Sequence, residues 1–278
     1  MEILFNELSL HGQFIDIDAF INNGLYPFLG VLSEMQKLSM TLLKKSDVWA
    51  TMPIPDNSLY SIITHGTYRN TDEVRRLKSA IIELTRDPYW DNESKQINDI
   101  NYVLEGVNIN GSSPAEACER DKIVVSFISS SVSIDPLNII RNELNVSLLN
   151  LTYSGALAEL LWNNKSISFE LYVKTRFYKG KLDFTKVDDK MGFAGIQSVD
   201  QSLFLSTFRK FEELSWDQIL CDKGLDYKAY NGNIGSGYKH IKTDKFRASK
   251  KIRCHGYRDN DSFIVIGFET DHKLSDQG

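Results

Sequence analysis

The residues that follow Lys250 alternate in character, and this alternation limits how the C-terminal part of the chain can fold. Successive side chains of an extended strand point to opposite faces. One face would carry Lys251, Arg253, His255 and Tyr257, and the other Ile252, Cys254 and Gly256. Turn-forming residues at 258–261 and an apolar run at 262–268 come next. The pattern predicts a β-hairpin with one cationic face and one face that packs on a core.

The same region is basic within a chain that is acidic as a whole. The window 239–258 holds eight Lys and Arg residues and one acid, a net charge of +7, whereas the whole chain carries −5. Clustered bases attract phosphate groups, and aromatic side chains stack on unpaired nucleic-acid bases. We therefore expect contact with nucleic acid, the alternative being a solvated basic edge strand that prevents aggregation. The predicted nucleic-acid-binding residues are Lys239, Lys242, Lys245, Arg247, Lys250, Tyr257 and Arg258.

Four side chains of this region are candidates for catalysis. Arg253 would stabilise charge on a phosphate group, with Lys251 assisting. His255 or His272 would transfer protons, because an imidazole with a near-neutral pKa can act as acid or base. The alternative for His272 is a surface histidine close to the C-terminus. This interpretation requires no metal and no cofactor.

The sequence as a whole predicts an α+β fold in two domains. Residues 1–198 would form a mixed α/β domain of unknown role. Residues 199–278 would form a small basic domain, in which a helix at 200–214 precedes the antiparallel hairpin. The loop-like sequence at 192–197 marks the expected boundary.

Four further elements are predicted within the first domain. Apolar residues at three- and four-residue spacing predict a helix at 28–43, and acids in the first turn favour a second helix at 72–84. The apolar run at 122–128 is typical of a buried strand. The aromatic, alternating sequence at 167–184 predicts one or two strands.

Composition excludes several other classes of protein. Hydrophobic residues make up 42% of the chain and charged residues 25%, proportions of a globular rather than a disordered protein. No apolar run approaches the roughly 18 residues of a membrane span, and the N-terminus lacks the pattern of a secretory signal. Three cysteines without close spacing favour a reducing compartment. We expect a cytoplasmic protein with no membrane partner.

The order of elements at 199–278 resembles the small toxins of the RelE/HigB ribonuclease superfamily. The residues that carry the resemblance are the helix 200–214, Lys245-Phe246-Arg247, Arg253, the apolar run 263–266 and His272. Such toxins place Lys and Arg on a compact antiparallel sheet and cut mRNA without a metal. The resemblance implies that Arg253 contacts the scissile phosphate, and that His255 or His272 exchanges protons with the 2′-hydroxyl and the leaving oxygen. The front part resembles uncharacterised bacterial proteins found near phage-defence genes.

These observations favour an RNA-acting protein of the bacterial toxin or defence type, a metal-independent endoribonuclease. A second hypothesis is a non-enzymatic subunit of a defence complex that binds nucleic acid or a partner. The partners would be RNA or another nucleic acid and a protein, either an antitoxin or a defence-complex subunit. A third hypothesis keeps the basic segment structural, within an oligomeric scaffold.

Two weaker constellations would require a metal. A zinc site could be assembled from Cys221, His240, Cys254, His255 and His272, although their spacing matches no compact zinc motif. A metal-dependent nuclease centre could use Glu170, Lys174 and Asp183, since residues four apart share one face of a strand.

Overall fold

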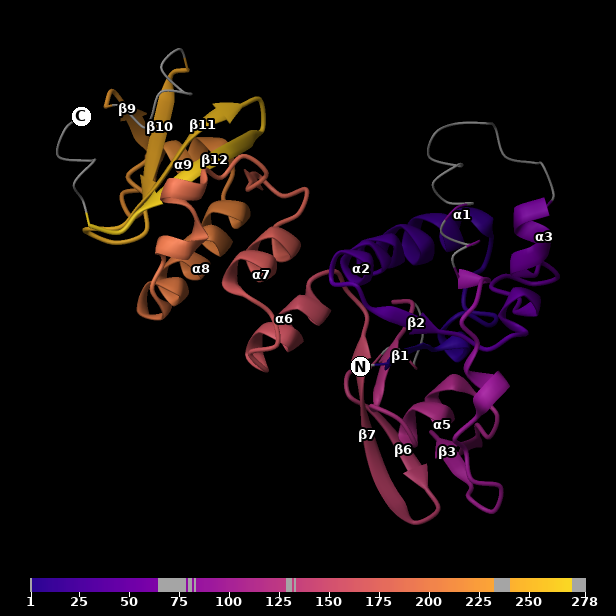
Figure 1. Ribbon diagram of the computed structural model, residues 1–278. Helices are drawn as coiled ribbons and strands as arrows, with labels where there is room; N and C mark the ends of the chain where they lie inside the picture. The colour runs from indigo at the N-terminus through magenta and orange to yellow at the C-terminus, as the bar shows by residue number, and fades with distance from the viewer. Residues whose placement is uncertain are drawn as a thin grey trace. The chain divides into compact units, whose positions relative to one another are not determined.

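The protein consists of two compact units, Met1–Leu160 and Leu161–Gly278, shown in the computed structural model of Figure 1. The structure describes residues 2–64, 79, 82, 84–128, 132, 134–232 and 241–271. Each unit contains its own sheet and its own helices, which confirms the predicted α+β class. The helix predicted at 72–84 lies largely outside the described residues.

The N-terminal unit is built on a seven-stranded sheet with the strand order β2-β1-β5-β7-β6-β3-β4. The first four strands in this order are parallel and the last three extend the sheet in antiparallel fashion. Parallel pairs need long crossover connections, and here helices supply part of them. The strands are β1 (Glu2–Phe5), β2 (Thr41–Leu43), β3 (Tyr102–Leu104), β4 (Val107–Asn108), β5 (Ile123–Val125), β6 (Leu137–Arg141) and β7 (Leu144–Leu151).

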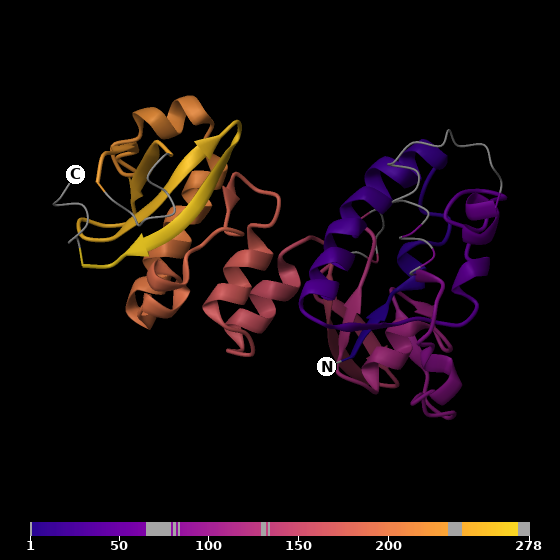
Figure 2. The ribbon, with the colours of Figure 1, turned by 45° about the horizontal axis from the view of Figure 1, so that its top comes forward.

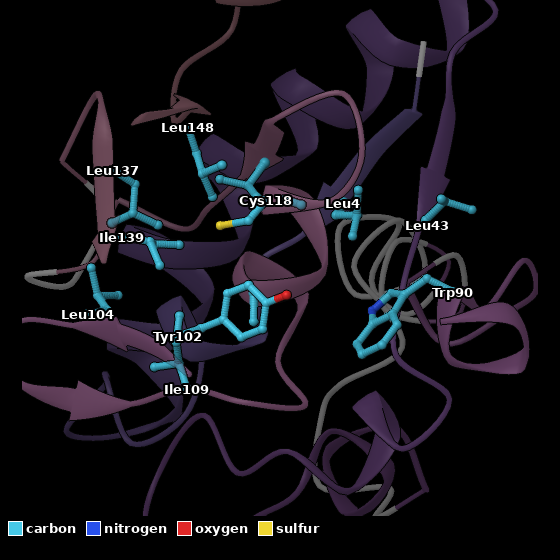
Figure 3. Packing of buried hydrophobic residues seen from close by; sticks show 13 residues of the cluster. Leu4, Leu43, Trp90, Tyr102, Leu104, Ile109, Cys118, Leu137, Ile139 and Leu148 are labelled. Atoms are coloured by element: carbon cyan, nitrogen blue, oxygen red, sulfur yellow. The ribbon is translucent and has the colours of Figure 1, made fainter. Parts of the chain in front are cut away.

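Helices cover both faces of the parallel strands. Leu4 of β1 packs in one apolar cluster with Cys118 of α5 (Ser113–Cys118), and Figure 3 shows these side chains. The neighbouring Phe5 points to the other face, where its ring lies 5.6 Å from that of Phe28 in α2 (Tyr26–Lys37). The unit also contains α1 (Ile17–Ala19), a π-helical turn (Phe20–Leu25), α3 (Leu59–Thr64), most of α6 (Ala156–Asn163), and 3₁₀ turns at Glu7–Ser9, Val48–Ala50 and Trp90–Glu93.

The helix predicted at 28–43 is shorter than expected. It ends at Lys37, and Ser39 adopts a left-handed backbone with φ of 53°, which a right-handed helix cannot continue. The residues after this turn form β2 instead. The buried strand predicted at 122–128 is confirmed as β5.

The C-terminal unit contains a five-stranded sheet with the order β8-β12-β11-β10-β9. All pairs are antiparallel except β8 with β12. Its strands are β8 (Leu182–Asp183), β9 (Lys228–Tyr230), β10 (Thr243–Arg247), β11 (Arg253–Asp259) and β12 (Ser262–Glu269). Its helices are α7 (Phe169–Arg176), α8 (Ser198–Glu213) and α9 (Trp216–Cys221). Short 3₁₀ turns lie at Asp189–Met191 and Phe193–Gly195.

The prediction of one or two strands within 167–184 is only partly correct, because Phe169–Arg176 form the helix α7 and the strand β8 is limited to Leu182–Asp183. The hydroxyl of Ser168 accepts a hydrogen bond from the Leu171 amide and so caps the helix. Phe169, Tyr172 and Val173 are buried at the three- and four-residue spacing of one helical face. The many aromatic residues of the segment therefore follow a helical period rather than an alternation.

The division between the units falls after Leu160, earlier than the boundary expected at 198. Leu182 of β8 pairs with Phe263 of β12, which makes this segment an edge of the C-terminal sheet. Phe184 packs on α8, with its ring 5.1 Å from that of Phe208. Residues ahead of 198 thus contribute both a strand and core side chains to the second unit.

Phenylalanine side chains fill the space between α8 and one face of the C-terminal sheet. Phe204, Phe208 and Phe211 of α8 are fully buried. They meet the rings of Phe246, Phe263 and Phe268 at centroid distances of 4.7–6.5 Å. This face of the sheet is therefore committed to the core, and polar side chains of the central strands occupy the other face.

Candidate nucleic-acid interface

The predicted hairpin is confirmed as β11 and β12, drawn in yellow in Figure 2. Their register pairs Arg253 with Glu269 and His255 with Gly267, and then shifts by one residue at a bulge beside Gly256. Cys254 is fully buried and pairs with Phe246 and Phe268 of the phenylalanine core. The predicted division of β11 into a core-facing side and a polar side is thus present.

Residues from four strands gather on the polar side, because directly opposed residues of an antiparallel pair share one face. Lys245 of β10 lies opposite both His255 and Lys228, and Arg247 lies opposite Arg253. We call this set the cationic face, and its members are Lys228 and Tyr230 of β9, Lys245 and Arg247 of β10, Arg253 and His255 of β11, and Glu269 of β12.

The centre of the cationic face is buried. His255 is fully buried, and Lys245 and Arg253 are only 4% and 7% exposed. This differs from the open platform that the alternation suggested, since β11 and β10 are flanked by strands on both sides. Lys251 precedes β11 and is exposed, so it does not share the strand face.

His255 is held by a carboxylate. Its Nε2 donates to Oε2 of Glu269 over 2.9 Å, and both side chains are buried. Burial lowers the pKa of His255, and the bond to Glu269 opposes that shift only in part. With Nε2 as the donor, Nδ1 is an acceptor, and it finds no hydrogen-bond partner among the described residues.

Lys245 lies beside His255 without a carboxylate of its own. Its ammonium is 4.8 Å from the ring centroid of Tyr230, whose ring in turn meets that of His255 edge to face. Burial, together with repulsion from Lys228, lowers the pKa of Lys245. Across the described part of the chain, no acceptor hydrogen-bonds to this ammonium, so its contact with Tyr230 is a cation–π interaction.

The guanidinium of Arg253 is anchored by backbone carbonyls. Its Nη1 donates to the oxygens of Ser249 at 2.5 Å and Ile252 at 3.1 Å. Burial and the nearby charge of Arg247 lower the pKa of Arg253, while Glu269 and Asp226 oppose the shift. Arg253 is therefore a fixed cation whose field reaches the rest of the face.

Lys228 and Arg247 form the rim of the face, which is more open than its centre, and one acid, Asp226, lies near both. Asp226 lies 3.2 Å from the ammonium of Lys228 and 3.9 Å from Nη1 of Arg247. Four cations thus interact with two carboxylates, Asp226 and Glu269, while His255 is neutral. Over these described residues the face carries a net charge of +2.

The other predicted residues lie apart from this cluster or outside the described part. Lys242 and Lys250 are exposed and lie outside the strands. Arg258 stacks on Trp216 at 3.9 Å, and Tyr257 accepts a hydrogen bond from Lys186 over 3.2 Å, both toward the hairpin turn. Lys239 and His272 lie outside the described residues.

The described residues form no metal-binding group. No cluster of three or more His, Cys, Asp or Glu side chains that could hold a metal occurs in this part of the protein. Cys254 faces the core, opposite His255, and Cys221 is exposed on α9; His240 and His272 are not described. Glu170 and Lys174, considered for a nuclease centre with Asp183, form an exposed ion pair of 2.6 Å along α7 instead of sharing a strand.

Sequence reasoning missed three members of the face, namely Lys228, Tyr230 and Glu269. Glu269 could have been found from the hairpin itself, because extending the register outward from the turn brings it near Arg253. Lys228 and Tyr230 belong to β9, a three-residue strand with no alternation long enough to recognise.

Comparison of the chain with family models, with curated proteins and with solved structures gave no match. The resemblance of residues 199–278 to the RelE/HigB toxins therefore stays a prediction. Within the described part, no helix combines the length and the apolar character needed to cross a membrane.

Proposed function

We propose that the C-terminal unit binds nucleic acid through the cationic face. The observation that carries the proposal is the strand register, which sets Lys245 opposite both His255 and Lys228 and sets Arg247 opposite Arg253, so that four cations lie on one face. Phosphate groups are the anions that such clusters attract, and neutralising them releases counterions. The acidic remainder of the chain would repel a polyanion from other surfaces.

The electrostatics of the cluster favour an anion as its ligand. Mutual repulsion contributes to the lowered pKa of both Lys245 and Arg253, so the cations raise one another's energy in the unbound protein. A bound phosphate would reverse the sign of this interaction and stabilise all four charges together. The rim cations Lys228 and Arg247 would make the first contacts because they are the more exposed.

Binding of a labelled single-stranded RNA, measured by fluorescence anisotropy over a range of salt concentrations, tests the proposal. The logarithm of the affinity falls with the logarithm of salt by about 0.7 per phosphate contact on a single strand. Four contacts predict a slope of about −3, and the double variant Lys228→Gln/Arg247→Gln should reduce it to about −1.4. Lys174→Gln, on the exposed face of α7, is the matched control. A wild-type affinity that does not change with salt refutes the proposal.

Cleavage of RNA is the second candidate function, and the His255–Glu269 pair beside Lys245 and Arg253 favours it. In this reaction the 2′-oxygen attacks the adjacent phosphorus, Nδ1 of His255 takes the proton of the 2′-hydroxyl, and the bond from phosphorus to the 5′-oxygen breaks while a water molecule gives that oxygen its proton. The products are a 2′,3′-cyclic phosphate and a 5′-hydroxyl end. Neighbouring cations would stabilise the developing phosphorane charge.

Incubation of end-labelled RNA in EDTA distinguishes the two candidates. Shortened RNA with intact DNA of the same sequence indicates cleavage through the 2′-hydroxyl, and His255→Gln should then abolish it. RNA that is retarded in a native gel but stays full-length indicates binding alone. Fragments that form only with added Mg²⁺ contradict the metal-independent mechanism.

A further inference from the structure

The cationic face has a floor and a rim, and they offer different things to a nucleic acid. Lys245, Arg253 and His255 form the floor and are at most 7% exposed, whereas Lys228 is exposed and Arg247 half-buried. A phosphodiester that passes over the face lies between two sugars and can reach the rim cations. A terminal phosphate carries a sugar on one side only, so it needs less room to approach the floor than a phosphodiester does.

The floor has hydrogen-bonding capacity that the described protein groups do not use. The Lys245 ammonium carries three donors and makes only the cation–π contact with Tyr230. Nδ1 of His255 is a buried acceptor that none of the described residues satisfies. A buried polar atom without a partner is costly, and the Nδ1 of His255 is such an atom, which points to a missing ligand.

We propose that the cationic face recognises a terminal phosphate, the phosphomonoester at the end of a nucleic-acid strand, in preference to the phosphodiesters within it. The inference rests on the proposed binding function and specifies its ligand. Lys228 and Arg247 would guide the strand end, and Lys245 and Arg253 would face the terminal phosphate.

Charge admits a monoester but does not single it out. The face carries +2 over its described residues, with Asp226 and Glu269 as its carboxylates. The second pKa of a phosphomonoester is about 6, and in the form that keeps this proton its charge is −1, the same as that of a phosphodiester.

The orphaned nitrogen of His255 separates the two esters. A phosphomonoester near its second pKa has a P–O–H group, and this hydroxyl can donate to Nδ1. A phosphodiester has no such proton at neutral pH. The charged and titratable groups that act on His255 are Glu269, Lys245 and Arg253, with Tyr230 against its ring, and the turn at Asp189–Met191 places the apolar Met191 against Gly267.

Three oligonucleotides of one sequence test the inference with the full-length protein. One carries a 5′-phosphate, one a 3′-phosphate, and one has hydroxyls at both ends. We expect one phosphorylated form to bind about tenfold more tightly than the hydroxyl form, and the better form identifies the end that is recognised. Lys245→Gln should remove this preference. Lys228→Gln should weaken the binding of all three to a similar degree, and Lys174→Gln should change none.

The outcomes separate this inference from the proposed function. Equal affinity of the wild type for all three strands, with the expected salt dependence, overturns the terminal-phosphate inference and leaves nucleic-acid binding standing. No binding of any strand at low salt overturns both. Thermal melting of each variant shows whether it is folded. If Lys245→Gln unfolds, competition by inorganic phosphate takes its place, since phosphate should displace the phosphorylated strand from the wild type at lower concentration than it displaces the hydroxyl strand.

Discussion

Replacing Glu269 by Gln should destabilise the C-terminal unit by about 3 kcal/mol. The Glu269 side chain is 1% exposed and accepts the hydrogen bond from His255. A bond to a charged group contributes about 1.5–3 kcal/mol, and the amide oxygen of Gln would retain only part of it. The substitution also removes a negative charge that acts on Lys245 and Arg253, which raises the net charge of the face from +2 to +3. We therefore place the expected loss toward the upper end of that range.

Hydrogen exchange read by mass spectrometry measures this change for each unit separately, which matters because a two-unit chain need not unfold in one step. A loss of about 3 kcal/mol corresponds to roughly a hundredfold faster exchange in the peptides of β10, β11 and β12, since every 1.4 kcal/mol is a factor of ten. Peptides of β1, β5 and β7 should not change. Glu170→Gln, which breaks an exposed pair on α7, is the control and should cost at most about 0.5 kcal/mol.

The reasoning is refuted if Glu269→Gln exchanges as slowly as the wild type at pH 7.5. Such a result would mean that the carboxylate contributes nothing beyond what a neutral amide supplies, and that the cations do not depend on it. A loss spread equally over both units would also contradict a local role for the pair with His255.

Three further predictions concern stability. His255 has a lowered pKa in the folded protein, so the unfolded chain binds the proton first, and stability should fall as the pH drops below about 6.5; His255→Gln should remove this dependence of the urea midpoint. Glu34 accepts the amides of Gly155 and Ala158, both over 2.6 Å, so Glu34→Ala should speed exchange at the start of α6 by a loss of about 1–3 kcal/mol. Gly256→Ala should lower the melting temperature, because its Cβ would lie 2.1 Å from the oxygen of Ile264.

The hairpin was predictable from sequence because its signals are local. A turn at 258–261 between two apolar or alternating segments specifies β11 and β12 without reference to the rest of the chain. The face of Arg253 and His255 followed from the same alternation. Burial of these side chains did not, since it depends on the flanking strands, and β9 lies more than twenty residues away from His255 in sequence.

The errors in the sequence analysis arose where two periodicities compete. The segment 167–184 is rich in aromatic and β-branched residues, which favour strands, yet the cap at Ser168 and the spacing of Phe169, Tyr172 and Val173 favour α7. The domain boundary was misplaced for a different reason: the loop-like sequence at 192–197 marked it, whereas the structure divides the chain after Leu160. The parallel pairing of β8 with β12 is long-range, and no local pattern reports it.

The crowding of charge on the cationic face links its stability to its function. Natural proteins hold buried cations next to carboxylates. Placing the Lys245 ammonium against the ring of Tyr230 costs folding free energy that an alanine or a methionine at this position would not cost. Such a cost persists where the arrangement serves binding, because a site that already holds its charges in place loses less entropy when a ligand arrives. The carboxylate of Glu269 limits the repulsion without neutralising the face. Because Glu269 offsets part of the repulsion among the cations, the unit can fold with these charges buried. Because the offset is partial, an anion would still be attracted to them.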